Sequence, residues 1–481
     1  MITFLTSIVL LVLGYIVYGK IAERVIAPDP NKKTPAYTMQ DGIDYIPMPT
    51  WKIFMIQFLN IAGLGPIFGA VLGAKFGTSA YIWIVLGCIF IGSVHDYTSG
   101  MLSLRRGGAN LPDLVGEYLG NSAKAVMRIF TIVLMIMVGA VFVSGPAAIL
   151  DSITPEFFNS YFWIGAIFVY YIVATLLPID KIIGKVYPLF AIALIFMAVG
   201  VFFALIFGGY GSNLPEITDG VANTHPSASS LPIFPCLCIT IACGAISGFH
   251  ATQSPLMARC LKNENLGRKV FYGSMILEGI MAMIWAAAAI WYYQENGLEE
   301  GNASKIVDFI TNTYLGKFGA VLALLGVVFA PITSGDTALR SCRLILADFL
   351  KVDQKKVSKR LMISIPLFVA TAGVIIYSLA DKDGFNTIWR YFGWSNQALS
   401  VFTLWAVTVY LAASNKKWML TFFPAVFMTL VGVTYLCIAP ECFGKIMNHT
   451  LGYIIGIVGA LLSIVMFFKW KASYNKKQVE K

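Results

Sequence analysis

Thirteen apolar stretches, each long enough to cross a bilayer, follow one another through the 481 residues of this chain. A membrane-spanning helix needs about 20 apolar residues. We expect such helices near residues 2–19, 51–73, 81–104, 126–150, 160–178, 186–208, 231–257, 270–293, 318–342, 361–379, 388–412, 418–438 and 450–469. Because lipid accepts only elements that satisfy their own backbone hydrogen bonds, the pattern predicts an all-α polytopic membrane protein of about 13 transmembrane helices.

The composition excludes most classes of soluble protein. Hydrophobic residues make up 58% of the chain and charged residues only 12%, against roughly 25% charged in an average soluble domain. The apolar residues are spread evenly, which indicates one helical bundle. With only four histidines and no zinc spacing or nucleophile signature, we expect no enzyme activity, no metal site and no cofactor.

The positive charges predict how the bundle is oriented. Lys and Arg gather in the cytoplasmic loops of membrane proteins. If the N-terminus lies outside, the loops after odd-numbered helices hold all of the 35 Lys and Arg except Lys75, Lys305, Lys317, Lys382, Arg390 and Lys445. We therefore expect a multi-pass membrane protein with its N-terminus outside and its C-terminus in the cytoplasm. The net charge of +10 then belongs to these loops, so no nucleic-acid partner is expected.

Glycine, proline and small polar residues interrupt the second and seventh stretches. The first interruption contains Asn60, Ala62, Gly63, Gly65 and Pro66, and the second covers about residues 244–255. A broken helix exposes backbone groups, which a membrane tolerates only where they line a cavity or contact a ligand. The interruptions therefore predict a binding site in the middle of the bundle. The alternative is that the small residues only permit close helix packing.

The interruptions also divide the chain into repeats. Residues 51–208 and 231–412 each contain five expected helices, and each set opens with a broken helix on the opposite side of the membrane from the other. Inverted repeats of this kind are typical of secondary transporters, and they indicate a LeuT-like (APC-type) 5+5 arrangement. Residues 1–50 would form the first transmembrane helix and a cytoplasmic strap. Residues 413–481 would form two accessory helices and a basic cytoplasmic tail.

The residues at the interruptions suit a small molecule that carries a carboxylate. Opened backbone at residues 62–66 can present amide groups at a half-helix N-terminus, which favours a carboxylate. The second interruption supplies polar side chains for the carbonyl or amide groups of a substrate: Ser247, His250, Gln253 and Ser254. His250 could also share a proton near neutral pH, although a lone membrane histidine can simply hydrogen-bond another helix.

Three carboxylates lie within expected spans: Asp96, Glu278 and Asp336. Ionisable residues inside membranes are candidates for ion or proton coupling. Structural alternatives remain open for two of them. Glu278 could be an interhelical hydrogen bonder, and Asp336 could form an ion pair with Arg340, which follows it by four residues on the same helix face.

Two further polar pairs stand out in otherwise apolar stretches. Thr333 and Ser334 precede Asp336, and in a LeuT-like arrangement such a pair resembles part of a sodium site, because oxygen ligands suit a hard cation. Ser and Thr also hydrogen-bond the preceding helical turn. Asn396 and Gln397 lie deep in the eleventh expected helix, where an unsatisfied amide is costly. We expect them to hydrogen-bond a neighbouring helix, or to gate the outer entrance.

Several motifs give the chain a resemblance to a known family. They are Leu13-Gly14-Tyr15 with Tyr18, the run from Asp41 to Pro47, the run from Ile61 to Pro66 with Gly69, Asp96 with Arg105-Arg106-Gly107, Ser247-Gly248-Phe249-His250, Asp336 with Arg340 and Arg343, and Phe392-Gly393 with Ser395-Asn396-Gln397. Together they make the chain similar to the carbon starvation (CstA) family over nearly its whole length. The resemblance implies uptake of short peptides or pyruvate across the bacterial cytoplasmic (inner) membrane, driven by an ion gradient, in the response to carbon starvation.

The expected function is therefore secondary active transport by alternating access, coupled to a proton or sodium gradient. The expected partners are a small-molecule substrate, either peptide or pyruvate, and the lipid bilayer. The rival functions are an uncoupled channel, which could use the same broken helices, and a membrane-embedded nutrient sensor, which would need an attached domain or a reactive cluster. The substrate, the coupling ion and the oligomeric state stay open at this point.

Overall fold

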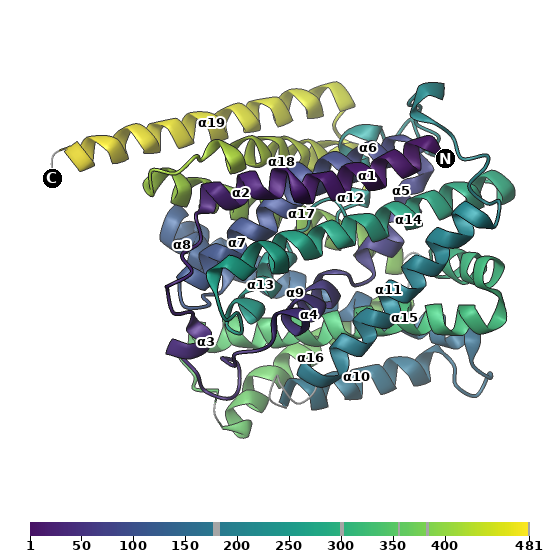
Figure 1. Ribbon diagram of the computed structural model, residues 1–481, viewed down its shortest axis with the longest axis horizontal. Coiled ribbons are helices and arrows are strands. Elements are labelled where there is room, and N and C mark those ends of the chain that lie inside the picture. Colours follow the sequence, from purple (N-terminus) through teal and green to yellow (C-terminus); the bar gives the residue numbers. More distant parts are fainter. Residues whose placement is uncertain (177–182, 299–302, 355, 381–383, 480–481) are drawn as a thin grey trace.

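The computed structural model describes residues 1–176, 183–298, 303–354, 356–380 and 384–479, and every regular element in these ranges is helical. The long helices run side by side in one bundle, in which α1 begins at one end and α19 finishes at the opposite end (Figure 1). The α-helices are α1 (Ile2–Ile16), α2 (Tyr18–Ile26), α3 (Pro35–Thr38), α4 (Thr50–Ile61), α5 (Ala70–Gly73), α6 (Ser79–Leu86), α7 (Ser93–Arg105), α8 (Leu111–Leu119), α9 (Asn121–Ile153), α10 (Ser160–Leu176), α11 (Ile183–Phe207), α12 (Ile233–Thr240), α13 (His250–Ala258), α14 (Gly273–Asn296), α15 (Ala303–Leu350), α16 (Val357–Ala380), α17 (Gly384–Ala413), α18 (Met419–Ile438) and α19 (His449–Val479). Short 3₁₀ or π turns join them: η1 (Gly65–Gly69), η2 (Ala74–Phe76), η3 (Gly87–Gly92), η4 (Ile217–Asp219), η5 (Glu264–Leu266), η6 (Arg268–Tyr272) and η7 (Phe443–Lys445).

Ten of the described helical segments are long and apolar enough to span a membrane, and the number is eleven if the bent pair Thr50–Ile61 and Gly65–Phe76 counts as one span. The structure thus confirms a multi-span helical bundle. Fewer of the described helices than the expected thirteen are long and apolar enough to span a membrane. Two expected stretches fall short. The described part of α10 has 17 residues, and residues 177–182 lie outside the described chain. The stretch near 231–257 is divided into α12 and α13, of eight and nine residues.

Both expected interruptions are present as breaks in helices, but the second lies at residues 241–249 and not at 244–255, because residues 250–255 belong to α13. In the first break, α4 ends at Ile61 and the chain turns by 52° before it continues in η1. In the second break, α12 ends at Thr240 and α13 begins only at His250. Gly244 within this break has a φ of +92°, which a residue with a Cβ resists.

The two breaks lie directly against each other in the core. A Cβ on Gly65 would collide with the Cβ and Sγ of Cys243, and a Cβ on Gly69 would lie 3.0 Å from the carbonyl oxygen of Thr240. All of these residues except the half-buried Thr240 are fully or almost fully buried. Glycine at these positions therefore allows the backbones of the two broken helices to touch.

Residues 27–49, which we call the strap, connect α2 to α4 across one end of the bundle (Figure 1). Arg105, at the end of α7, holds the start of the strap. It donates hydrogen bonds to the carbonyl oxygens of Ile26 (3.1 Å) and Ala27 (2.8 Å) and to the hydroxyl of Tyr410 in α17 (3.0 Å). It also forms an ion pair with Glu264 at 2.8 Å. One guanidinium thus ties α2, α7, α17 and the turn before α14 together.

Candidate functional site

The second break is held in place by Asn396 of α17. Its side-chain oxygen accepts hydrogen bonds from the Ser247 hydroxyl (3.1 Å) and from the backbone N–H of Phe249 (2.6 Å). Its backbone oxygen accepts a third, from the N–H of Gly248 (3.2 Å). A side-chain amide thus satisfies backbone groups that the missing helix would otherwise have paired.

Gln397, the next residue of α17, braces the same break from both sides. Its Nε2 donates to the carbonyl oxygen of Cys238 (2.9 Å), within α12, and to that of Ile246 (3.1 Å), within the break. The two amides therefore hydrogen-bond a neighbouring helix, which is one of the two roles expected from the sequence. They act on the backbone of the break, so we regard them as positioning residues.

A chain of buried ionisable groups ends at the second break. One Asp96 oxygen lies 2.8 Å from Nδ1 of His95, and the other lies 2.8 Å from Nδ1 of His250. Nε2 of His250 is 3.4 Å from one oxygen of Glu278. The second Glu278 oxygen accepts a hydrogen bond from the N–H of Gly244 at 3.1 Å. The four ionisable side chains are 0% exposed, and we call them the buried relay.

The relay brings together residues that the sequence did not predict as a unit. Asp96 and His95 come from α7, His250 begins α13, and Glu278 lies in α14. Each carboxylate flanks one edge of the His250 imidazole, so the ring can hold a proton between them or pass one along. Away from water, hydrogen bonds and charges of this kind are stronger than on a surface.

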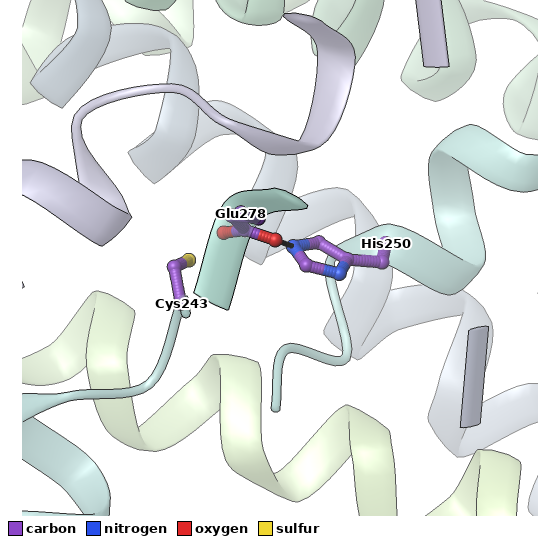
Figure 2. A group of neighbouring side chains, drawn as sticks. All are labelled: Cys243, His250 and Glu278. Carbon is purple, nitrogen blue, oxygen red and sulfur yellow. Dashed lines mark ion pairs between the residues drawn. The ribbon is translucent and has the colours of Figure 1, made fainter. Parts of the chain in front are cut away.

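Three side chains at the break could also be considered as metal ligands. Cys243, His250 and Glu278 each offer a ligand atom, and these atoms lie within 4.8 Å of one another. Figure 2 shows that Glu278 and His250 point toward each other, with Cys243 beside them. The Cys243 thiol donates to the Ser247 hydroxyl at 3.5 Å, and Glu278 serves both His250 and Gly244. Each of the three side chains thus has at least one contact within the protein, and two of them, His250 and Glu278, belong to the buried relay.

Side chains at the first break have a different character, because they lack partners. Asn60 is fully buried, and neither atom of its amide has a hydrogen-bond partner in the described chain. Gln57, one turn earlier in α4, is also fully buried, and both atoms of its amide likewise lack a hydrogen-bond partner there. Ala62, Gly63, Gly65 and Pro66 are likewise buried. Gln57 was not predicted from the sequence, although a glutamine three residues before Asn60 in an apolar helix was the available signal.

The remaining residues expected at the second break differ in how their polar atoms are used. Gln253 donates to the hydroxyl of Thr252 at 2.9 Å, and its side-chain oxygen has no partner in the described chain. The Ser254 hydroxyl donates back to the carbonyl oxygen of His250 at 3.0 Å. Gln253 is therefore still able to accept a hydrogen bond, whereas the hydroxyl hydrogen of Ser254 is used by its own helix.

The hydroxyl pair of α15 lies beside the first break. Ser334 donates to the carbonyl oxygen of Leu59 in α4 (2.9 Å) or to that of Ala330 (3.0 Å). The Thr333 hydroxyl donates within its own helix, to the carbonyl oxygens of Phe329 (3.0 Å) or Ala330 (2.8 Å). Ser334 and the Leu59 carbonyl thus place two oxygens of different helices together, which is the donor type that a hard cation prefers.

Asp336 and Arg340, which could pair within one helix, each have a hydrogen-bond partner on another helix. Asp336 accepts a hydrogen bond from the hydroxyl of Tyr187 in α11 at 2.6 Å. Arg340 reaches to the carbonyl oxygen of Ala174 in α10 (2.7 Å). Both side chains of this helix face thus take partners from neighbouring helices. The Tyr187 hydroxyl also lies 3.3 Å from the Thr333 carbonyl oxygen.

Comparison with known proteins gives consistent results. A family profile described as "Carbon starvation protein CstA" matches residues 1–156, 151–297 and 295–435. An "Uncharacterized membrane protein" of Haemophilus influenzae is 43% identical over 61% of this chain and 92% of its own length. The "Peptide transporter CstA" of Bacillus subtilis is 26% identical over 97% of this chain and 96% of its own. The "Pyruvate/proton symporter BtsT" of Escherichia coli is 27% identical over 56% of this chain and 46% of its own.

Solved structures of transporters share the fold. A Na⁺-coupled sialic acid symporter superposes with a TM-score of 0.57, at 12% identity, over 96% of each chain. A manganese transporter of Eremococcus coleocola superposes with a TM-score of 0.55, at 12% identity, over 91% of this chain and 99% of its own. At such identities the likeness concerns the fold alone, and it supports the LeuT-like class.

Proposed function

We propose that this chain, which belongs to the carbon starvation protein CstA family, is a secondary active transporter that imports short peptides, pyruvate or both. Two relatives support this substrate class, because they are named as a peptide transporter and as a pyruvate/proton symporter. In this proposal the protein serves uptake of carbon nutrients during starvation. It works in the inner membrane of a bacterium and is not an enzyme.

The proposed topology has thirteen spans. The ten long segments, the bent pair at the first break, α10, and α12 with α13 together make up this number. Residues 51–208 and 231–412 would be two five-helix units of opposite orientation. The N-terminus would lie outside and the C-terminus inside, as the distribution of Lys and Arg favours. The bundle supports this topology by having α1 begin and α19 finish at opposite ends (Figure 1).

One observation carries the proposal: the two broken helices meet in the core, and the buried relay ends on the backbone of one of them. Opened backbone at membrane depth is tolerated where it contacts a ligand. Gly65 against Cys243 brings the breaks together, and Glu278 joins the relay to the N–H of Gly244. Cargo bound between the breaks would therefore lie next to a group that can take up a proton.

The relay suggests how proton and cargo binding are coupled. A charged carboxylate accepts a stronger hydrogen bond than a neutral carboxylic acid. When a proton neutralises Glu278, its bond to the Gly244 N–H weakens, and the backbone of the second break can rearrange. Asp96 and His95 orient His250 so that it exchanges the proton with Glu278. The broken helices would then rock against the remaining helices and open to the other side.

A second ion could bind between α4 and α15. Ser334, Thr333 and the Leu59 carbonyl supply oxygens there, and Asp336 is linked to the same turn through Tyr187. In this version of the proposal sodium occupies the hydroxyl site, or Asp336 carries a proton in its place. We favour proton coupling through the relay, because Glu278 accepts a hydrogen bond from backbone within a break, whereas Ser334 bonds to a carbonyl oxygen within α4.

The decisive test is uptake by the purified protein in proteoliposomes. Labelled pyruvate and labelled dialanine are offered separately under an imposed pH gradient, an imposed sodium gradient, or neither. We expect accumulation above the outside concentration with the pH gradient, and its collapse on addition of a protonophore. Uptake that only equalises the two concentrations would indicate a channel. No flux of either compound under any gradient would favour a sensor and would contradict the proposal.

A further inference from the structure

Two amide side chains of α4 are unusual among the buried amides that the structure describes. Gln57 and Asn60 are each 0% exposed, and in both the nitrogen and the oxygen lack a hydrogen-bond partner in the described chain. Other buried amides have at least one partner: Asn396 and Gln397 bond to the second break. The two unpartnered amides thus concentrate in one helix, immediately before the first break.

Their positions in α4 place both amides together. Residues three apart lie on the same face of a helix, so Gln57 and Asn60 form a short polar stripe. Ala62, the first residue after α4, begins the break two residues beyond Asn60. The same helix packs against α11, α13, α14 and α15, so the stripe is enclosed within the bundle.

Buried polar groups without partners cost free energy, since they lose their hydrogen bonds to water and gain none in the protein. Nearly all such groups in folded proteins are paired. Apolar side chains of the same size would fit an enclosed helix without this cost. Two amides kept in this state, next to opened backbone, indicate partners that arrive with a ligand.

We infer that Gln57 and Asn60 bind the cargo, and that they select cargo carrying N–H donors as well as oxygen acceptors. This inference rests on the proposed function, because it identifies what the transporter binds. Each amide offers an NH₂ donor and a carbonyl acceptor. A peptide group, with its N–H and C=O, can satisfy both halves of an amide. A keto acid at neutral pH offers only acceptors, and it would leave both amide oxygens unpaired.

Other unpartnered atoms around the breaks point to the same chemistry. The side-chain oxygen of Gln253 has no partner in the described chain, and one oxygen of Glu278 has only His250 nearby, at 3.4 Å. Both are acceptors. Gln253 lies in α13 and Glu278 in α14, and both helices pack against α4. Together with Gln57 and Asn60 they offer four oxygens that can receive N–H groups, which a short peptide supplies from its amide and its ammonium group. Selectivity for such cargo follows, because an analogue without the donors leaves buried groups unpaired.

The test uses Gln57→Met, which replaces the amide by an apolar side chain of similar length. We expect the KM for dialanine uptake to rise at least tenfold, which corresponds to about 1.4 kcal/mol of binding free energy. The melting temperature of the cargo-free variant should stay the same or rise, since an unpaired polar group has been removed. Asn60→Leu should behave alike.

The control is Ile53→Val, a mild change at a buried position one turn earlier in α4, for which KM should not change.

The measurements separate this inference from the proposed function. Transport by the wild type with an unchanged KM in Gln57→Met would overturn the role of Gln57. Saturable pyruvate uptake that a large excess of dialanine does not inhibit would overturn the donor requirement. If the wild type moves neither probe, the proposed function fails. Stabilisation of the wild type by dialanine in a thermal-shift assay, absent in Gln57→Met, would still support the binding role, and its absence in both would overturn it.

Discussion

Replacing Glu278 by Gln tests whether the buried relay couples transport to protons. The substitution keeps the size of the side chain and leaves a carbonyl oxygen to accept the hydrogen bond from Gly244. It removes the ability to bind and release a proton. We therefore expect Glu278→Gln to exchange cargo across the membrane while losing accumulation driven by a pH gradient.

The expected effect of Glu278→Gln on stability is small. At the 3.4 Å between Glu278 and His250, an effective dielectric constant of about 20 gives an attraction of about 5 kcal/mol. Burying a carboxylate costs several kcal/mol, so the two contributions nearly cancel. His250 also keeps Asp96, at 2.8 Å, as its partner. The melting temperature should accordingly change by only a few degrees, and a loss of transport would not reflect unfolding.

The assay is uptake into proteoliposomes with a pH difference of one unit. That difference supplies about 1.4 kcal/mol per proton, enough for roughly tenfold accumulation of a cargo carried with one proton. We expect the wild type to accumulate cargo and Glu278→Gln to reach only equal concentrations, with counterflow preserved. Glu278→Asp should keep partial coupling, and Glu117→Gln, at an exposed ion pair in α8, should match the wild type. Normal accumulation by Glu278→Gln would refute the relay.

Three further substitutions test other parts of the structure. Gly65→Leu drives a side chain into Cys243, and this overpacking, about 1–3 kcal/mol, should abolish uptake while the protein remains in the membrane; normal uptake would contradict the site at the breaks. Ser334→Ala removes the hydroxyl that bonds to the Leu59 carbonyl, so any stimulation of uptake by limiting sodium should be lost, and an identical sodium response would exclude this position. Arg105→Lys keeps the charge without the guanidinium fork, and thermal unfolding in detergent should show a loss of about 1–3 kcal/mol; an unchanged melting temperature would show that the strap contacts contribute little.

The positions of the breaks could be predicted from the sequence because they depend on local chemistry. Gly65 and Pro66 interrupt one helix and Gly244 opens another, and each residue acts through its own backbone geometry. The predicted roles of Asn396 and Gln397 as interhelical hydrogen bonders followed from the cost of burying an amide. Which groups they would bond could not be predicted, because their partners lie about 150 residues away along the chain.

Helical periodicity could not predict the partners that side chains take from other helices. Asp336 and Arg340 share a helix face, yet the carboxylate bonds to Tyr187 and the guanidinium to the Ala174 carbonyl. An ion pair within one helix is worth only a few tenths of a kcal/mol. Buried hydrogen bonds to charged groups are worth more, so tertiary contacts decide the outcome.

The sequence by itself determined that this chain is a bundle of membrane helices with two breaks, since hydropathy and helix-breaking residues act over a few residues. Only the tertiary structure decided that His95, Asp96, His250 and Glu278 form one relay, because Asp96 and His250 are separated by 154 residues. It also decided that Gln57 and Asn60 would be left without partners in the described chain. Both outcomes depend on how several helices pack around the same few side chains, which local patterns do not encode.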